Sequence, residues 1–231
     1  MGCMYKANGL YSRMSVGAVL LAAGAGSRLG GRPKALLELG GVPLVMRQLI
    51  ALSGAGVDEL AVVLGHHAPE IEAAIAQFPI TVVHNPHPDS GQASSVRLGL
   101  QALSPRLDAV MVALADQPLI DAQDITTVIS AFRRRGDKSM VVPRVSLADG
   151  SSVPGNPVMF DASLRERWLS GSADLTCRQW RDQHPETVFW MDTDNQHFSV
   201  DIDTPEDLAR FAAQTGHVLN WPSQREVPTA A

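Results

Sequence analysis

Apolar runs of strand length alternate with longer segments of helical period along this chain, and no other feature constrains the fold as much. The first four runs are rich in Val, Leu, Ile and Ala, as expected for strands covered on both faces. They are residues 16–22, 59–64, 80–84 and 109–114. Helical segments follow at residues 43–53, 69–77 and 94–103, and a further helix begins after Asp121, its expected N-cap. The alternation predicts an α/β fold: a Rossmann-like, mostly parallel sheet with helices on both faces.

The second half of the chain is less regular. Strands are expected at residues 140–145, 157–160, 187–191 and 199–202. Helices are expected at 162–170, 174–183 and 205–214, the last capped by Thr204. No internal repeat or linker interrupts the pattern, so residues 16–216 are expected to form a single domain. Residues 1–15 are expected to be a flexible N-terminal extension without a secretory segment, and 217–231 a C-terminal tail.

Composition excludes several partners. The net charge of -5 gives no general attraction to nucleic acid or to an anionic membrane, so any phosphate binding must be local. No apolar run reaches the roughly 18 residues that a membrane-spanning helix needs. Cys3 and Cys177 are too few for a disulfide framework, which favours a reducing, cytoplasmic location.

A glycine-rich loop follows the first predicted strand directly, at the edge where open α/β sheets bind ligands. Its small residues would let backbone N–H groups approach a phosphate closely. These residues are Ala22, Ala23, Gly24 and Gly26. Arg28 and Lys34 add two positive charges, which a triphosphate requires. The loop therefore predicts nucleotide binding, and a bare flexible turn is the structural alternative.

Two other glycine motifs fit this loop poorly. A P-loop requires Gly-Lys-Ser/Thr, but Lys34 stands between Pro33 and Ala35. A dinucleotide-binding loop requires Gly-x-Gly-x-x-Gly, and Leu29 occupies the place of its third glycine.

The loop resembles a known signature, Leu-Ala-Ala-Gly-x-x-x-Arg-x-Gly followed by Pro-Lys, of nucleotidyltransferases with a Rossmann-like fold. The short gap between Arg28 and Lys34 is similar to the molybdenum-cofactor branch (MocA/MobA-like) rather than to the sugar-nucleotide pyrophosphorylases. Within that branch, the Ala-Ala-Gly at residues 22–24 is similar to the cytidylyl group rather than the guanylyl group.

Carboxylates follow two other predicted strands. Asp116 ends the strand at 109–114, and Asp201 and Asp203 would point the same way from an extended segment. One or two carboxylates, with phosphate oxygens and water, suit Mg²⁺. The resemblance implies that Asp116 and Asp201 hold the metal, whereas the residues alone leave Asp203 as either a ligand or a helix-entry residue.

The segment at 91–99 opens the third helix, with Ser94 or Ser95 as its expected N-cap. The resemblance implies more, namely that Gly91 and Ser95 contact the base and ribose. A departure occurs at Asn156, where relatives carry His in a Gly-His-Pro segment. This departure puts the identity of the acceptor in doubt.

Taken together, the resemblance implies an Mg²⁺-dependent enzyme that transfers CMP from CTP to molybdopterin and releases pyrophosphate. Arg28 and Lys34 would be its catalytic cations, and a molybdoenzyme maturation chaperone would be its partner. Two alternatives stay open. The acceptor could be a sugar phosphate or another small phosphorylated metabolite, or the chain could be an inactive nucleotide-binding accessory protein.

Overall fold

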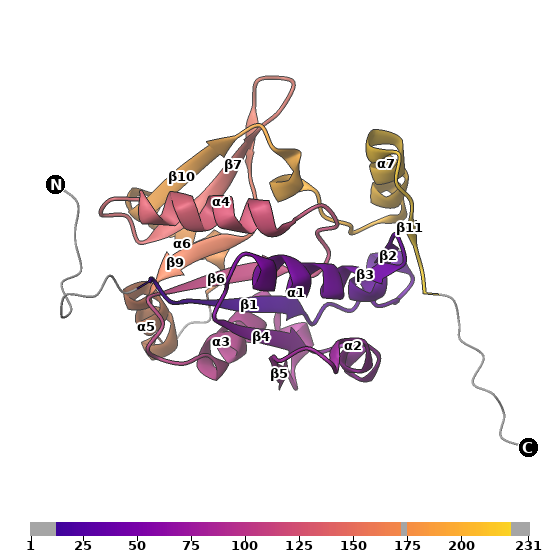
Figure 1. Cartoon of the computed structure of the whole chain (residues 1–231), viewed down its shortest axis with the longest axis horizontal. Helices are drawn as coiled ribbons and strands as arrows, with labels where there is room; N and C mark the ends of the chain where they lie inside the picture. Colours follow the sequence, from indigo (N-terminus) through magenta and orange to yellow (C-terminus); the bar gives the residue numbers. More distant parts are fainter. Residues whose placement is uncertain (1–12, 172–174, 223–231) are drawn as a thin grey trace, which may run out of the picture.

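An eight-stranded sheet forms the centre of the computed structural model, which describes residues 13–171 and 175–222 (Figure 1). Along its hydrogen-bonded path the strands are β10 (Val188–Thr193), β7 (Met140–Ser146), β9 (Val158–Asp161), β6 (Ala109–Leu114), β1 (Val16–Ala22), β4 (Glu59–Leu64) and β5 (Thr81–His84), and β8 (Ser152–Pro154) pairs with β7. Strands β6, β1, β4 and β5 are parallel, as are β7 and β10, whereas β9 is antiparallel to β6 and β7. The predicted, mostly parallel α/β fold is confirmed.

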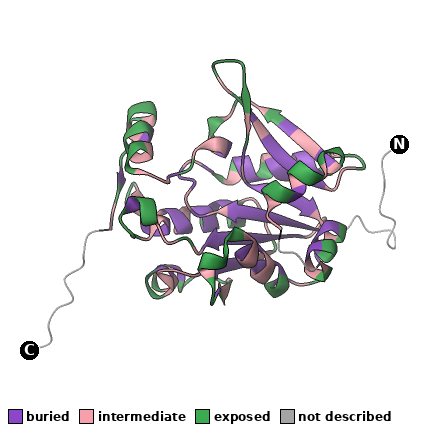
Figure 2. Cartoon of the chain, turned by 180° about the vertical axis from the view of Figure 1, so that it is seen from behind, coloured by how far each residue is buried: buried purple, intermediate pink, exposed green. Residues whose placement is uncertain are grey.

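Helices cover both faces of this sheet (Figure 1). One layer comprises α1 (Leu44–Gly54), α2 (Ala68–Ile75) and α4 (Ala122–Arg133), and the other comprises α3 (Gln92–Ala102), α5 (Ala162–Ser170) and α6 (Cys177–Gln183). Side chains of β1 alternate between the layers: Leu20 packs on the first, and Val19 and Leu21 pack on the second. Figure 2 shows the central strands largely buried, so the unbroken apolar runs are explained by burial on both faces.

A smaller sheet lies at one end of the molecule, beside α7 (Pro205–Thr215) (Figure 1). It consists of β11 (Leu219–Asn220), β2 (Glu38–Leu39) and β3 (Val42–Pro43). Its apolar cluster joins distant segments, including Leu29 of the glycine-rich loop, Ile202, Phe211 and Leu219. The structure thus differs from the expected C-terminal tail, because the first part of 217–231 pairs with β2. Residues 1–12 of the expected extension and 223–231 of the expected tail lie outside the described residues.

Three local predictions differ from the structure. Residues 199–202 were expected to form a strand, but a 3-10 turn at Gln196–Ser199 is followed by an irregular segment in which the N–H of Ile202 donates to the carbonyl of Asp116. Helix α3 begins at Gln92, so Gly91 is the N-cap and neither Ser94 nor Ser95 caps it. Helix α6 begins at Cys177 with Thr176 as its cap, not at 174, which lies outside the described residues.

Two predicted helix caps are confirmed. Asp121 caps α4 and Thr204 caps α7, each in a reciprocal capping box with the acidic residue three positions later. These caps depend on neighbours in the chain, which explains why local sequence was sufficient. None of the helices within residues 13–171 and 175–222 is long and apolar enough to cross a membrane.

Candidate active site

A pocket of about 330 Å³ opens at the carboxyl ends of β1 and β6. Its walls come from the glycine-rich loop, the start of α3, the end of β6 and the segment before α7. Eight of the residues expected in the site line it: Ala22, Ala23, Gly24, Lys34, Gly91, Ser95, Asp116 and Asp201. Parallel strands bring segments that are far apart in the sequence to the same edge of a sheet, which is where such folds bind ligands.

Gly26 and Arg28 do not line this pocket. Gly26 has a φ of 62°, and its carbonyl accepts from the N–H groups of Leu29 at 2.8 Å and Gly31 at 3.0 Å. A Cβ at Gly26 would lie 2.0 Å from the carbonyl oxygen of Arg32, so no larger residue fits. Gly26 therefore folds the loop back on itself, and this fold presents the lining residues Ala23 and Gly24 to the pocket.

An ionic network crosses the pocket. Lys34 Nζ donates to Asp116 Oδ2 at 2.6 Å and to Asp203 Oδ1 at 2.5 Å, and Arg28 donates to Asp203 Oδ2 at 2.7 Å. Burial acts to lower the pKa of Lys34, but Asp116 and Asp203 outweigh it and raise that pKa, so the ammonium stays protonated. Burial acts to raise the pKa of Asp203, but Lys34 and Arg28 outweigh it and lower that pKa. Asp203 is thus a charged partner of both cations, which sequence reasoning had left open.

Asp201 lies on the same pocket but has a different electrostatic environment. Burial, together with the negative charges of Asp116 and Asp203, raises its pKa above the ordinary value for an aspartate. The second oxygen of Asp116, Oδ1, is buried without a hydrogen-bond partner. A buried, unpartnered carboxylate oxygen and a destabilised carboxylate nearby fit a divalent cation with oxygen ligands. The residues present are therefore suitable for Mg²⁺.

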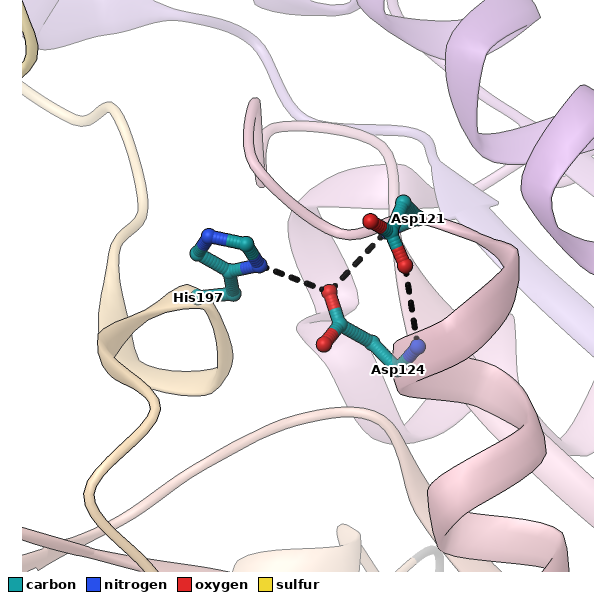
Figure 3. Close-up of side chains that lie close together, drawn as sticks. All are labelled: Asp121, Asp124 and His197. Carbon is teal, nitrogen blue, oxygen red and sulfur yellow. Dashed lines mark hydrogen bonds and ion pairs between the residues drawn. The ribbon is translucent and has the colours of Figure 1, made fainter.

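A second acidic cluster contains Asp121, Asp124 and His197 (Figure 3). Asp124 Oδ2 accepts from the N–H of Asp121 at 3.1 Å and lies 2.8 Å from His197 Nδ1. Asp124 Oδ1 accepts from Asn195 Nδ2 at 2.6 Å. These bonds connect the start of α4 to the turn that leads to Asp201.

Asn156, which stands where relatives carry His, does not line the pocket. Its N–H donates to the carbonyl of Phe198 at 2.8 Å, and Gln117 Nε2 donates to the same carbonyl at 3.1 Å. The Phe198 carbonyl thus connects the segment after β8 to Gln117, which lies just after β6. Sequence reasoning missed lining residues from other segments that carry no reactive group, such as Ile71 and Pro88, which only the tertiary structure could bring here.

Fold and pocket together define the class of protein: an α/β domain whose pocket lies at the carboxyl edge of a parallel sheet, where such folds bind ligands. The chain belongs to the MobA-like NTP transferase domain family, whose model matches residues 18–188, and it is a nucleotidyltransferase. A Paenarthrobacter nicotinovorans protein named nicotine blue oxidoreductase is 33% identical to it over 84% of this chain and 94% of that protein. The 2-C-methyl-D-erythritol 4-phosphate cytidylyltransferase of Streptomyces coelicolor is 36% identical over 61% of this chain and 56% of that enzyme.

Solved structures show the same relationship. A nucleotidyl transferase from Methanothermobacter thermautotroptrophicus superposes with a TM-score of 0.68 at 27% identity, covering 87% of this chain and 97% of that one. Rv0371c from Mycobacterium tuberculosis, in its manganese complex, superposes with a TM-score of 0.68 at 25% identity, covering 85% of this chain and 97% of that one. A divalent metal therefore binds at least one structural relative.

Proposed function

We propose that this chain transfers CMP from CTP to molybdopterin, releasing pyrophosphate in an Mg²⁺-dependent reaction. The observation that carries the proposal is the convergence of two cations and three carboxylates beside one pocket. Lys34 and Asp116 come from segments 82 residues apart, and Lys34 and Asp203 from segments 169 apart. An arrangement with this much charge on one small cavity suits a polyanionic substrate with a metal ion.

The chain's own groups have distinct proposed roles. Ala23 and Gly24 line the pocket and carry no side chain larger than a methyl group, so their backbone N–H groups would be able to approach a phosphate closely. Lys34 and Arg28 would stabilise the negative charge that develops on the departing pyrophosphate. Mg²⁺, when bound by Asp116 and Asp201, would supply a Lewis acid for the phosphate oxygens.

The choice of CTP rests on the Ala-Ala-Gly at residues 22–24 and on the cytidylyltransferase among the relatives. The choice of molybdopterin rests on resemblance to the molybdenum-cofactor branch and on the match to the MobA-like family. A phosphorylated sugar or other small metabolite is the alternative acceptor, since Asn156 replaces the His of that branch. In this proposal the chain works in the cytoplasm and delivers its product to a molybdoenzyme maturation chaperone.

The oxidoreductase named among the relatives raises a second reaction class. A dinucleotide-binding glycine loop needs a third glycine at position 29, but Leu29 is 7% exposed and packs in the apolar cluster with Phe211. A loop filled in this way favours a mononucleotide triphosphate. Oxidation of a nicotinamide or flavin cofactor is therefore included below as a discriminating assay.

Pyrophosphate release is measured for each of four NTPs with molybdopterin, sugar phosphates and polyol phosphates, with and without Mg²⁺. The proposal expects the highest turnover with CTP, molybdopterin and Mg²⁺ together. Equal turnover with other acceptors would overturn the assignment of molybdopterin, and cofactor oxidation without pyrophosphate release would overturn the transferase.

Variants test the site in the same assay. Lys34→Ala and Asp116→Ala are each expected to lower turnover by about 10²-fold or more, since each removes an electrostatic catalyst. Asp149→Ala is the matched control, because Asp149 is exposed in the hairpin between β7 and β8, does not line the pocket, and accepts from the N–H and the hydroxyl of nearby Ser151. Unchanged turnover in both site variants would mean that the active site lies elsewhere, whereas nucleotide binding without turnover in the unaltered chain would favour the inactive accessory protein.

A further inference from the structure

A buried asparagine, Asn85, connects the end of β5 to the start of α3. Its side-chain amide donates to Ser94 Oγ at 3.0 Å and to Ser95 Oγ at 2.9 Å. Its Oδ1 accepts from the backbone N–H of His87 at 2.9 Å. A backbone N–H can only donate, so the amide oxygen must face His87 and both amide hydrogens must face the serines.

The two serines use their own hydrogens differently. Ser94 Oγ donates to the carbonyl of Gly91 at 2.8 Å, and Ser94 does not line the pocket. Ser95 is 3% exposed and does line the pocket. Its oxygen accepts from Asn85, and within residues 13–171 and 175–222 no hydrogen bond uses its hydroxyl hydrogen. Ser95 therefore has one hydrogen-bond donor left for a ligand.

The depth of Ser95 in the pocket wall is set by close packing of α3. Gly99 lies one turn further along the same face of the helix. A Cβ at Gly99 would lie 2.3 Å from Val19 Cγ1 of β1 and 2.9 Å from Val63 Cγ2 of β4. Helix α3 thus approaches the sheet as closely as its backbone allows, which holds Ser95 beside the carboxyl end of β1.

We propose that Asn85 is a positioning residue that directs the Ser95 hydroxyl, as a donor, toward an acceptor oxygen of the NTP bound in this pocket. The inference rests on the proposed nucleotidyltransferase function and adds a determinant of nucleotide affinity. Asn85 itself does not line the pocket, so its effect on the nucleotide passes through Ser95.

A double-mutant cycle tests this pathway, using Ser95→Ala, Asn85→Leu, the double variant and Ser94→Ala as matched control. CTP and GTP affinities are measured by calorimetry with Mg²⁺, alongside KM and kcat. Ser95→Ala is expected to weaken binding of the preferred nucleotide by about 5–10-fold, the usual effect of one hydrogen bond. Asn85→Leu should weaken it by a similar or smaller factor, and kcat should change by less than about 2-fold, since the bond is made equally in ground and transition states.

The decisive result is the double variant, which should bind no more weakly than Ser95→Ala alone. Additive losses, a fall in kcat at constant KM, or equal weakening in Ser94→Ala would overturn the inference. Thermal unfolding reports whether each variant folds, and Asn85→Ala replaces Asn85→Leu in the cycle if the latter does not. If the chain binds nucleotide but transfers nothing, the proposed function is wrong, and the affinity cycle still tests the role of Asn85. If the chain binds neither CTP nor GTP, both proposals are overturned.

Discussion

Replacement of Lys34 by methionine should allow the pocket to bind a divalent metal ion without nucleotide, because it removes the positive charge that neutralises the carboxylates. In the structure the Lys34 ammonium bridges Asp116 and Asp203, at 2.6 and 2.5 Å. Its positive charge thus neutralises part of the negative charge that would otherwise attract a divalent cation to Asp116 and Asp201. Methionine keeps the length of the side chain and removes its charge, while Arg28 still neutralises part of Asp203.

The magnitude follows from charge and exposure. Two unit charges about 4 Å apart interact by about 4 kcal/mol at an effective dielectric constant near 20. The side chains of Lys34 and Asp116 are 17% and 20% exposed, so solvent screens part of that energy. Halving it leaves about 2 kcal/mol, which corresponds to roughly 30-fold tighter metal binding.

Mn²⁺ serves as the probe, and its binding to nucleotide-free protein is followed by electron paramagnetic resonance. Lys138→Met is the matched control, because Lys138 is bonded to the carbonyl of Glu186 and does not line the pocket. Adding Asp116→Asn to Lys34→Met should abolish the gain. Equal Mn²⁺ affinity in the wild type and Lys34→Met, or a gain that survives Asp116→Asn, would refute the electrostatic reasoning.

Three further predictions concern the frame around the site. Gly99→Ala should destabilise the fold by about 2 kcal/mol through overpacking of α3 on the sheet, lowering Tm by about 4–8 °C in thermal unfolding; an unchanged Tm would contradict the close contact. Burial raises the pKa of the Cys177 thiol to about 12, so little reactive thiolate is present at pH 8. In a Cys3→Ser variant, the folded protein should therefore react with a disulfide reagent at least about 100-fold more slowly than the same variant unfolded in urea. Ending the chain just before β11 should cost about 1.5–3 kcal/mol of unfolding free energy by exposing the cluster around Leu219. Ending it just after Trp221, which packs against the same cluster, should cost much less, as denaturant titration would show.

Much of the fold was predictable because its signals are local. Apolar runs predicted the strands, and the capping residues Asp121 and Thr204 bond to groups three positions away. The residues of the glycine-rich loop carried both the chemistry of phosphate binding and the resemblance to a family. Short elements such as β2, β3 and β8 were missed, since two or three residues are too few for a period to show.

The sequence by itself determined which residue types and which strand ends could serve a nucleotide, because side-chain charge and hydrophobic period are properties of neighbouring residues. Only the tertiary structure decided that Lys34 pairs with Asp203 and that Asn85 donates a hydrogen bond to Ser95. It also decided that Leu219 completes the cluster beneath the loop. These contacts join segments that periodicity treats separately, and their distances are set by how closely helices and strands pack, which no local pattern records.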